Sequence, residues 1–155
     1  MFFSKRICGV QTIEPDYLRH FYRGLIFVSL RCKFTIFLLF MNNRELRVIA
    51  DAILDKKGED VISLDLRPIG TAITDFFMVC TGTSTTMVSA IADNILKEAK
   101  EKLGIKPLRM QGLENAFWVI IDFGNVVVHI FLKEYREFYR LEDLWADAPR
   151  VTYTD

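Results

Sequence analysis

The stretch from Leu64 to Thr85, LDLRPIGTAITDFFMVCTGTST, indicates how this chain folds. Pro68 and Gly70 break regular structure in its first half. The part that follows, residues 75–81, is apolar at nearly every position, which is typical of a central strand buried on both faces. A turn then leads into a helix that is expected to begin at Ser84. The stretch therefore predicts a strand, a loop, a buried strand and a helix.

The flanking sequence extends this pattern to a whole domain. Apolar spacing predicts, in order, a helix over residues 44–57, a strand over 60–66, the buried strand over 75–81, a helix over 84–103, strands over 107–111, 117–122 and 126–132, and one or two short helices over 133–145. The last two strands resemble a hairpin around Phe123, Gly124 and Asn125. This order implies an α/β (α+β) fold, a mixed sheet of about five strands flanked by helices.

The first forty residues differ from the rest of the chain. They hold seven of the thirteen phenylalanines, and Arg31 and Lys33 break their apolar stretch, which is therefore too short to span a bilayer. Met41 is followed at once by a helix start. We interpret residues 1–40 as an atypical leader, 41–150 as the functional domain and 151–155 as a tail. Translation that starts at Met41 explains the leader, and a transit peptide is the alternative.

Charge and cysteine content bound the class of function. The chain has no net charge, yet residues 41–155 hold fourteen Lys+Arg and eighteen Asp+Glu, a net of −4. An acidic body is a poor partner for phosphate backbones and suits a basic protein better. The three cysteines form no CxxC pair, which favours a reducing, cytoplasmic location and offers no zinc site. No metal and no cofactor are expected.

The turn GTST at residues 82–85 is the strongest candidate for chemistry. Its amide groups and the following helix could hold a phosphate, although a helix cap at Thr83 or Ser84 explains the turn more simply. Nucleotidyltransferases carry a similar turn, but their Mg²⁺ ions need clustered carboxylates. No such pair follows Ser84, and Asp122 stands alone on its strand. We therefore predict that the chain is not an enzyme.

The other polar positions have structural explanations. Asp65 and Asp75 lie at strand ends and are expected to accept hydrogen bonds that fix the loop between them. His129 alternates with apolar neighbours on a strand, which favours a hydrogen-bonded structural histidine over a general base. Arg136 and Glu137 are interpreted as part of a solvated helix face.

One face of the strand over residues 117–122 is a candidate partner-binding surface. Trp118, Ile120 and Asp122 alternate with three apolar residues and share the face opposite to them. If helices cover only one face of the sheet fully, Trp118 and Ile120 form an accessible apolar surface edged by acid. Tryptophan is a favoured interface anchor, so Trp118→Ala is expected to weaken partner binding while the fold stays intact. The alternative is that Trp118 is another core residue.

The segment from Tyr135 to Trp145 is expected to add an acidic surface. Apolar spacings of three and four predict that one side docks on the sheet through Phe138, Leu141, Leu144 and Trp145. The outer face then consists of Glu134, Glu137, Glu142, Asp143 and Asp147. We predict that Glu142 and Asp143 assist the binding of a basic partner, and that replacing both with lysine changes the melting temperature little.

Five separated motifs resemble the ribosomal silencing factor family, also called Iojap-like proteins. The motifs are LDLRPIGTAITDFF, CTGTST, AIADNI, WVIIDFGNVVVHIF and FYRLEDLWADAP, which occur in this order between about residues 43 and 149. Departures are small: the family often has a serine pair where Thr71 and Ala72 stand, and an acidic residue where Asn125 stands. The resemblance implies a nucleotidyltransferase-like fold that lacks the metal-binding carboxylates.

The resemblance also implies a function. Members of this family bind the large ribosomal subunit through its fourteenth protein, block joining of the small subunit and repress translation when nutrients are limiting. Such occlusion needs affinity and position but no reaction, in agreement with the scarcity of reactive groups. A nucleotidyltransferase-type enzyme and an assembly factor for the large subunit are the alternatives. Neither direct DNA binding nor membrane association is expected, and a homodimer is left open.

Overall fold

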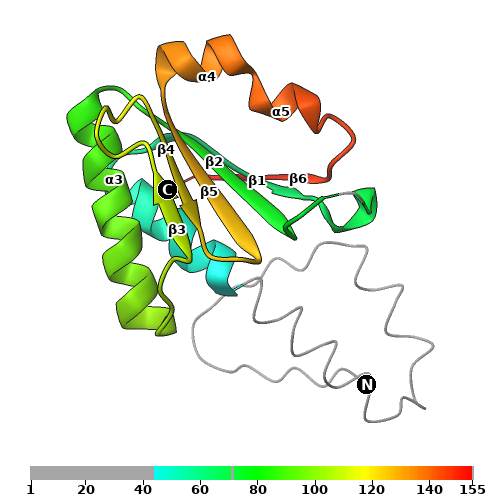
Figure 1. Ribbon diagram of the computed structural model, residues 1–155, viewed down its shortest axis with the longest axis horizontal. Coiled ribbons are helices and arrows are strands. Elements are labelled where there is room, and N and C mark those ends of the chain that lie inside the picture. The colour runs from blue at the N-terminus through cyan, green and yellow to red at the C-terminus, as the bar shows by residue number, and fades with distance from the viewer. Residues whose placement is uncertain (1–43, 71, 155) are drawn as a thin grey trace, which may run out of the picture. The chain divides into compact units, whose positions relative to one another are not determined.

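The computed structural model describes residues 44–70 and 72–154, which are built around a six-stranded sheet (Figure 1). A helix over residues 44–54 comes first. The elements that follow are β1 (Glu59–Asp65), the 3₁₀ turn η2 (Arg67–Ile69), β2 (Phe76–Gly82), α3 (Thr85–Glu98), the π-helical turn η3 (Ala99–Leu103), β3 (Arg109–Gln111), β4 (Trp118–Asp122), β5 (Val126–Leu132), α4 (Lys133–Tyr139), α5 (Leu141–Leu144) and β6 (Arg150–Tyr153). The expected leader and the start at Met41 lie outside the described residues.

The sheet is mixed, with the strand order β3-β4-β5-β2-β1-β6. Its central neighbours β2 and β5 are parallel, and the remaining neighbours are antiparallel. Nearly all residues of β2 are buried, as its apolar sequence predicts. β4 and β5 form the expected hairpin, in which Phe123 N–H donates to the Val126 carbonyl oxygen. A mixed sheet flanked by helices is therefore confirmed.

One face of the sheet, here called the closed face, is covered by two helices. These are α3 and the helix over residues 44–54, which lie on the side opposite α4 and α5 (Figure 1). The side chains that they bury there include Leu46, Ile49, Ile53, Val88, Ile91 and Ile95. The buried Asn94 amide donates to the Ala52 carbonyl oxygen over 2.8 Å, which ties the two helices together. Gly82 is needed at the end of β2, because a Cβ atom there would lie 2.8 Å from the Val88 side chain.

The opposite face, here called the open face, is covered only in part. α4 and α5 cross it, and their residues Tyr135 and Leu141 pack on a cluster that includes Leu64, Val79 and Phe131. α4 contacts β5 and β2. The α4–α5 segment therefore leaves the part of this face around Ile120 of β4 and Val127 of β5 uncovered. No helix of the described residues is long and apolar enough to cross a membrane.

The sheet has six strands, one more than the sequence predicts. The additional strand, β6, pairs antiparallel with β1 and includes residues 151–153, which were expected to form a tail. Its hydroxyl-bearing residue Tyr153 lies 3.1 Å from the Ser63 hydroxyl, measured between the oxygen atoms. β6 is an edge strand with mostly exposed residues, so it lacks the apolar run by which a central strand is recognised.

Candidate partner-binding surface

The uncovered part of the open face forms a hollow of about 270 Å³, here called the open hollow. Its lining residues are Ile73, Phe77, Arg109, Met110, Gln111, Ile120, Asp122, Val127 and His129. Ile120 and Asp122 are both half-buried, and they lie here on the face that the alternation in β4 predicts. Ile73 stands at the rim with 98% of its surface exposed. The hollow is thus mainly apolar and is formed mostly by side chains on strands, an arrangement that suits an interface.

Trp118 lies on the same face but partly beneath α4. Its indole ring stacks on Phe131 with a centroid distance of 4.8 Å and lies 4.9 Å from the Tyr139 ring. The indole Nε1–H donates to His129 Nδ1 over 3.3 Å. The ring is therefore fixed by contacts inside the molecule, and its N–H is already used. Trp118→Ala removes these contacts along with any contact to a partner, so this substitution does not test the surface alone.

His129 is a buried, hydrogen-bonded histidine, as its sequence context predicts. Because Nδ1 accepts the hydrogen bond from Trp118 Nε1–H, the proton of the neutral imidazole belongs on Nε2. Burial lowers the pKa of His129 to about 4, an effect that the charge of Glu142 partly opposes. Nε2 is buried and has no hydrogen-bond partner among the described residues. The Phe77 ring lies edge-on to the imidazole, with centroids 4.7 Å apart.

A second hollow, of about 480 Å³, lies between α4, α5 and the β1–β6 edge of the sheet and is here called the charged hollow. Its lining residues are Asp60, Ile62, Thr81, Lys133, Arg136, Glu137, Arg140, Glu142, Asp143, Arg150 and Thr152. Glu142 and Asp143, predicted from the sequence as partner-binding residues, lie here and not beside Ile120. The structure therefore divides the five candidate residues among three places: Ile120 and Asp122 in the open hollow, Glu142 and Asp143 in the charged hollow, and Trp118 under α4.

The charged hollow corrects the expected roles of Arg136 and Glu142. Arg136 donates to Glu142 Oε1 from Nε over 2.8 Å and from Nη2 over 2.5 Å. Its Nη1 donates to the Asp60 carbonyl oxygen over 2.9 Å and to Thr81 Oγ1 over 2.7 Å. The two charged side chains are only 13% and 15% exposed. Arg136 thus links α4 to α5 and to two strands through hydrogen bonds that are largely shielded from water. Its interpretation as a solvated residue, and that of Glu142 as part of an outer acidic face, were wrong.

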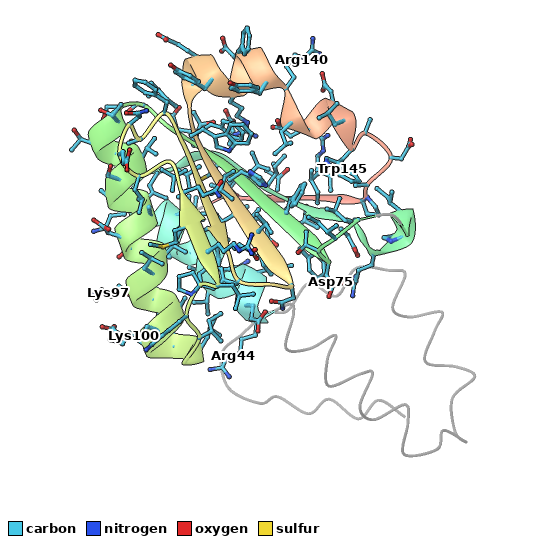
Figure 2. The ribbon with its side chains drawn as sticks, in the orientation of Figure 1. Arg44, Asp75, Lys97, Lys100, Arg140 and Trp145 are labelled. Atoms are coloured by element: carbon cyan, nitrogen blue, oxygen red, sulfur yellow. The ribbon has the colours of Figure 1, made fainter. Side chains whose placement is uncertain are left out.

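The expected apolar stripe of the α4–α5 segment is also wrong in two of its four members. Leu141 and Trp145 pack on the sheet, and Figure 2 shows Trp145 on the side of α5 that faces the strands. Phe138 and Leu144, however, are 79% and 76% exposed. The reason lies at Arg140, which has a left-handed φ of 46° and separates α4 from α5. A spacing rule for one continuous helix does not hold across such a residue.

Asp65 and Asp75, which were expected to fix the loop between them, differ in their hydrogen bonds. Asp65 accepts hydrogen bonds from the backbone and the guanidinium of Arg67, and the side-chain hydrogen bond is the main reason that the pKa of Asp65 is lowered. Asp65 therefore fixes the loop as predicted. No hydrogen bond within the described residues reaches the Asp75 carboxylate, whose backbone oxygen instead accepts from Leu66 N–H. Ser84 is the cap of α3, and its Oγ accepts from Met87 N–H.

The described residues offer little for a metal or a nucleophile. Within residues 44–70 and 72–154, no three His, Cys, Asp or Glu side chains are grouped so that they could hold a metal ion. The Cys80 thiol is fully buried, and burial raises its pKa to about 12, so it remains protonated at neutral pH.

Part of the open hollow was not predicted from the sequence. Phe77, Val127 and Ile73 line it together with Ile120. Phe77 pairs with Val127 across the parallel β2–β5 ladder, and this register is what places their side chains on one face. Their apolar character is visible in the sequence, but nothing local in it indicates that α4 leaves them uncovered. The signal that could have found them is the strand register.

Comparison with known proteins identifies the family. The model of a family described as ribosomal silencing factor during starvation matches residues 41–155. The chain belongs to the ribosomal silencing factor family. A protein named ribosomal silencing factor RsfS, from Halalkalibacterium halodurans, is 48% identical over 112 residues, which cover 72% of this chain and 94% of that protein. Mitochondrial assembly of ribosomal large subunit protein 1, from the mouse, is 29% identical over 103 residues, 65% of this chain and 45% of that protein.

A solved structure of a protein from Bacillus halodurans supports the same fold for this member of the ribosomal silencing factor family. It superposes with a TM-score of 0.61 and is 43% identical in sequence. The match covers 70% of this chain and 97% of that protein. The mixed sheet with its flanking helices is therefore shared with that solved structure.

Proposed function

We propose that this ribosomal silencing factor binds the large ribosomal subunit through its fourteenth protein, blocks joining of the small subunit and so represses translation when nutrients are limiting. The observation that carries the proposal is the open hollow. It presents apolar side chains from four strands and the neighbouring loop in a fixed arrangement, as a protein interface requires. The hollow also includes the carboxylate of Asp122, and residues 41–155 carry a net charge of −4, which suits a basic ribosomal protein.

Occlusion of a binding surface is the proposed mechanism, without a catalytic step. A protein that prevents two subunits from joining needs affinity for one of them and a body that fills the space of the other. The candidate residues Ile120 and Asp122 supply contact area and position, and neither needs a reactive group. A cytoplasmic location, where ribosomes assemble and work, belongs to the same proposal.

Assembly of the large subunit is the second candidate function. The observation that favours it is the name of the mouse relative, which refers to assembly of the ribosomal large subunit. The two functions differ in the particle that responds. A silencing factor acts on mature subunits, whereas an assembly factor acts on precursors. Purified mature subunits mixed with the chain therefore separate the two.

Replacing Ile120 with aspartate is expected to weaken binding to the large subunit by about 2 kcal/mol or more, roughly 30-fold, because truncating or charging an interface anchor has effects of this size. The measurement is a titration of labelled chain with purified large subunits. Val151→Asp is the matched control, because Val151 is also an apolar strand residue, 55% exposed, but lies on β6 at the opposite edge of the sheet.

The control variant should bind like the original chain. Circular dichroism of both variants establishes that each is folded. If folded Ile120→Asp binds with unchanged affinity, the open hollow is not the surface that meets the subunit.

A further inference from the structure

The segment from Lys97 to Arg109 carries a local excess of positive charge. It holds five of the fourteen Lys+Arg of residues 41–155 but only two of the eighteen Asp+Glu. The five cations, here called the basic strip, are Lys97, Lys100, Lys102, Lys106 and Arg109. All five are at least partly exposed. The average charge of −4 therefore hides a cationic strip on an otherwise acidic body.

Local pairing leaves much of this charge available. Glu98 is only 12% exposed and lies between two lysines, 2.6 Å from Lys102 Nζ and 4.0 Å from Lys97 Nζ. Its hydrogen bond with Lys102 lowers the pKa of Glu98 and raises that of Lys102. Lys100, Lys106 and Arg109 form no ion pair within the part of the chain that the structure describes. The strip therefore keeps unneutralised cations on both sides of Gly104.

The strip runs around one edge of the sheet to the open hollow. Lys97 and Lys100 lie on the outer side of α3, near the C-terminal end of that helix (Figure 2). The chain then ends the helix at Gly104, which has a left-handed φ of 70°, and enters β3, the edge strand. Arg109 of β3 lines the open hollow. The basic strip is thus continuous with the surface proposed to bind the ribosomal protein.

We propose that the basic strip contacts phosphates of the ribosomal RNA beside the protein that occupies the open hollow. This inference rests on the proposed function and adds a second kind of partner to it. Exposed lysines and arginines spaced along a chain are the groups that neutralise a phosphate backbone, and the large subunit presents RNA around its proteins. The apolar hollow supplies the protein contact, and the strip supplies an electrostatic contact that depends on salt.

The salt dependence of binding tests this inference with the full chain and purified large subunits. Lys100→Gln combined with Lys106→Gln should reduce the slope of log affinity against log salt by about 0.7–0.9 for each phosphate that the variant no longer neutralises. Lys133→Gln combined with Arg150→Gln is the matched control, since both residues are exposed cations that line the charged hollow. The control pair should leave the slope unchanged, because it lies away from the basic strip.

Binding to the isolated fourteenth protein, which carries no RNA, separates this inference from the proposed function. The strip variant should bind the isolated protein like the original chain, whereas Ile120→Asp should bind both the isolated protein and the subunit more weakly. An unchanged salt slope for the strip variant, or an equal decrease in the control pair, overturns the RNA contact. Equal weakening of the strip variant toward the isolated protein assigns the strip to a protein partner and also overturns it. Failure of the original chain to bind the subunit overturns the proposed function itself.

Discussion

Replacing Glu142 with lysine is expected to lower the free energy of unfolding by about 3–5 kcal/mol, in place of the small change expected when Glu142 was assigned to an outer face. The substitution removes the carboxylate that receives two hydrogen bonds from Arg136 and places a second cation beside that guanidinium. Both partners are largely shielded from water, so solvent does not replace the hydrogen bonds that the substitution removes. Urea denaturation at neutral pH, followed by circular dichroism, measures the change.

Asp143→Lys is the matched control for this experiment. Asp143 is the next residue and also forms an ion pair, 2.5 Å from Arg140 Nη2, but these two side chains are 57% and 72% exposed. An exposed pair of this kind contributes about 0–1 kcal/mol, so the control should lose little stability. Equal and small losses of stability in both variants would show that the hydrogen bonds of Arg136 do not hold α4 and α5 on the sheet.

A loss of stability in mild acid is the second large expected effect. The pKa of His129 is about 4 in the folded chain, below the ordinary value of 6.5 expected after unfolding. Between these values the unfolded chain binds more protons, so the contribution of His129 is complete above pH 6.5 and is lost as the pH falls toward 4. A difference of this size corresponds to about 3 kcal/mol. Denaturation midpoints at several pH values in this range measure it.

His129→Gln isolates this contribution. The glutamine amide oxygen can accept the hydrogen bond from Trp118 Nε1–H, but the side chain does not titrate. The variant should therefore lose less stability than the original chain between neutral pH and pH 4, while carboxylates such as Asp65 titrate in both. Identical pH profiles for the two proteins would mean that His129 is not held neutral by burial.

The central part of the fold could be predicted because its signals are local. Alternation along β4 placed Trp118, Ile120 and Asp122 on one face, and the structure confirms that face. The apolar run in β2 and the cap at Ser84 are equally local, since each depends on a few adjacent residues. Such patterns reflect steric and hydrogen-bonding rules that act within one element.

The features that could not be predicted depend on long-range or irregular geometry. β6 is a short, exposed strand whose pairing with β1 joins residues about ninety positions apart, such as Val61 and Tyr153. The Arg136–Glu142 pair spans the left-handed residue Arg140, so the spacing rule for one continuous helix placed Glu142 on the wrong surface. The open hollow exists because α4 and α5 stop short of it, a property of tertiary packing that no local pattern contains.

Sedimentation of ribosomal subunits with added chain shows whether the chain keeps the two subunits apart. Mature small and large subunits are mixed under conditions that favour joined ribosomes, with and without the chain, and the particles are separated on a sucrose gradient. The proposed occlusion predicts that the chain moves with the large subunit and shifts joined ribosomes toward free subunits, and that Ile120→Asp does so much less than Val151→Asp. Joined ribosomes that persist while the chain remains bound to the large subunit would contradict the proposed occlusion.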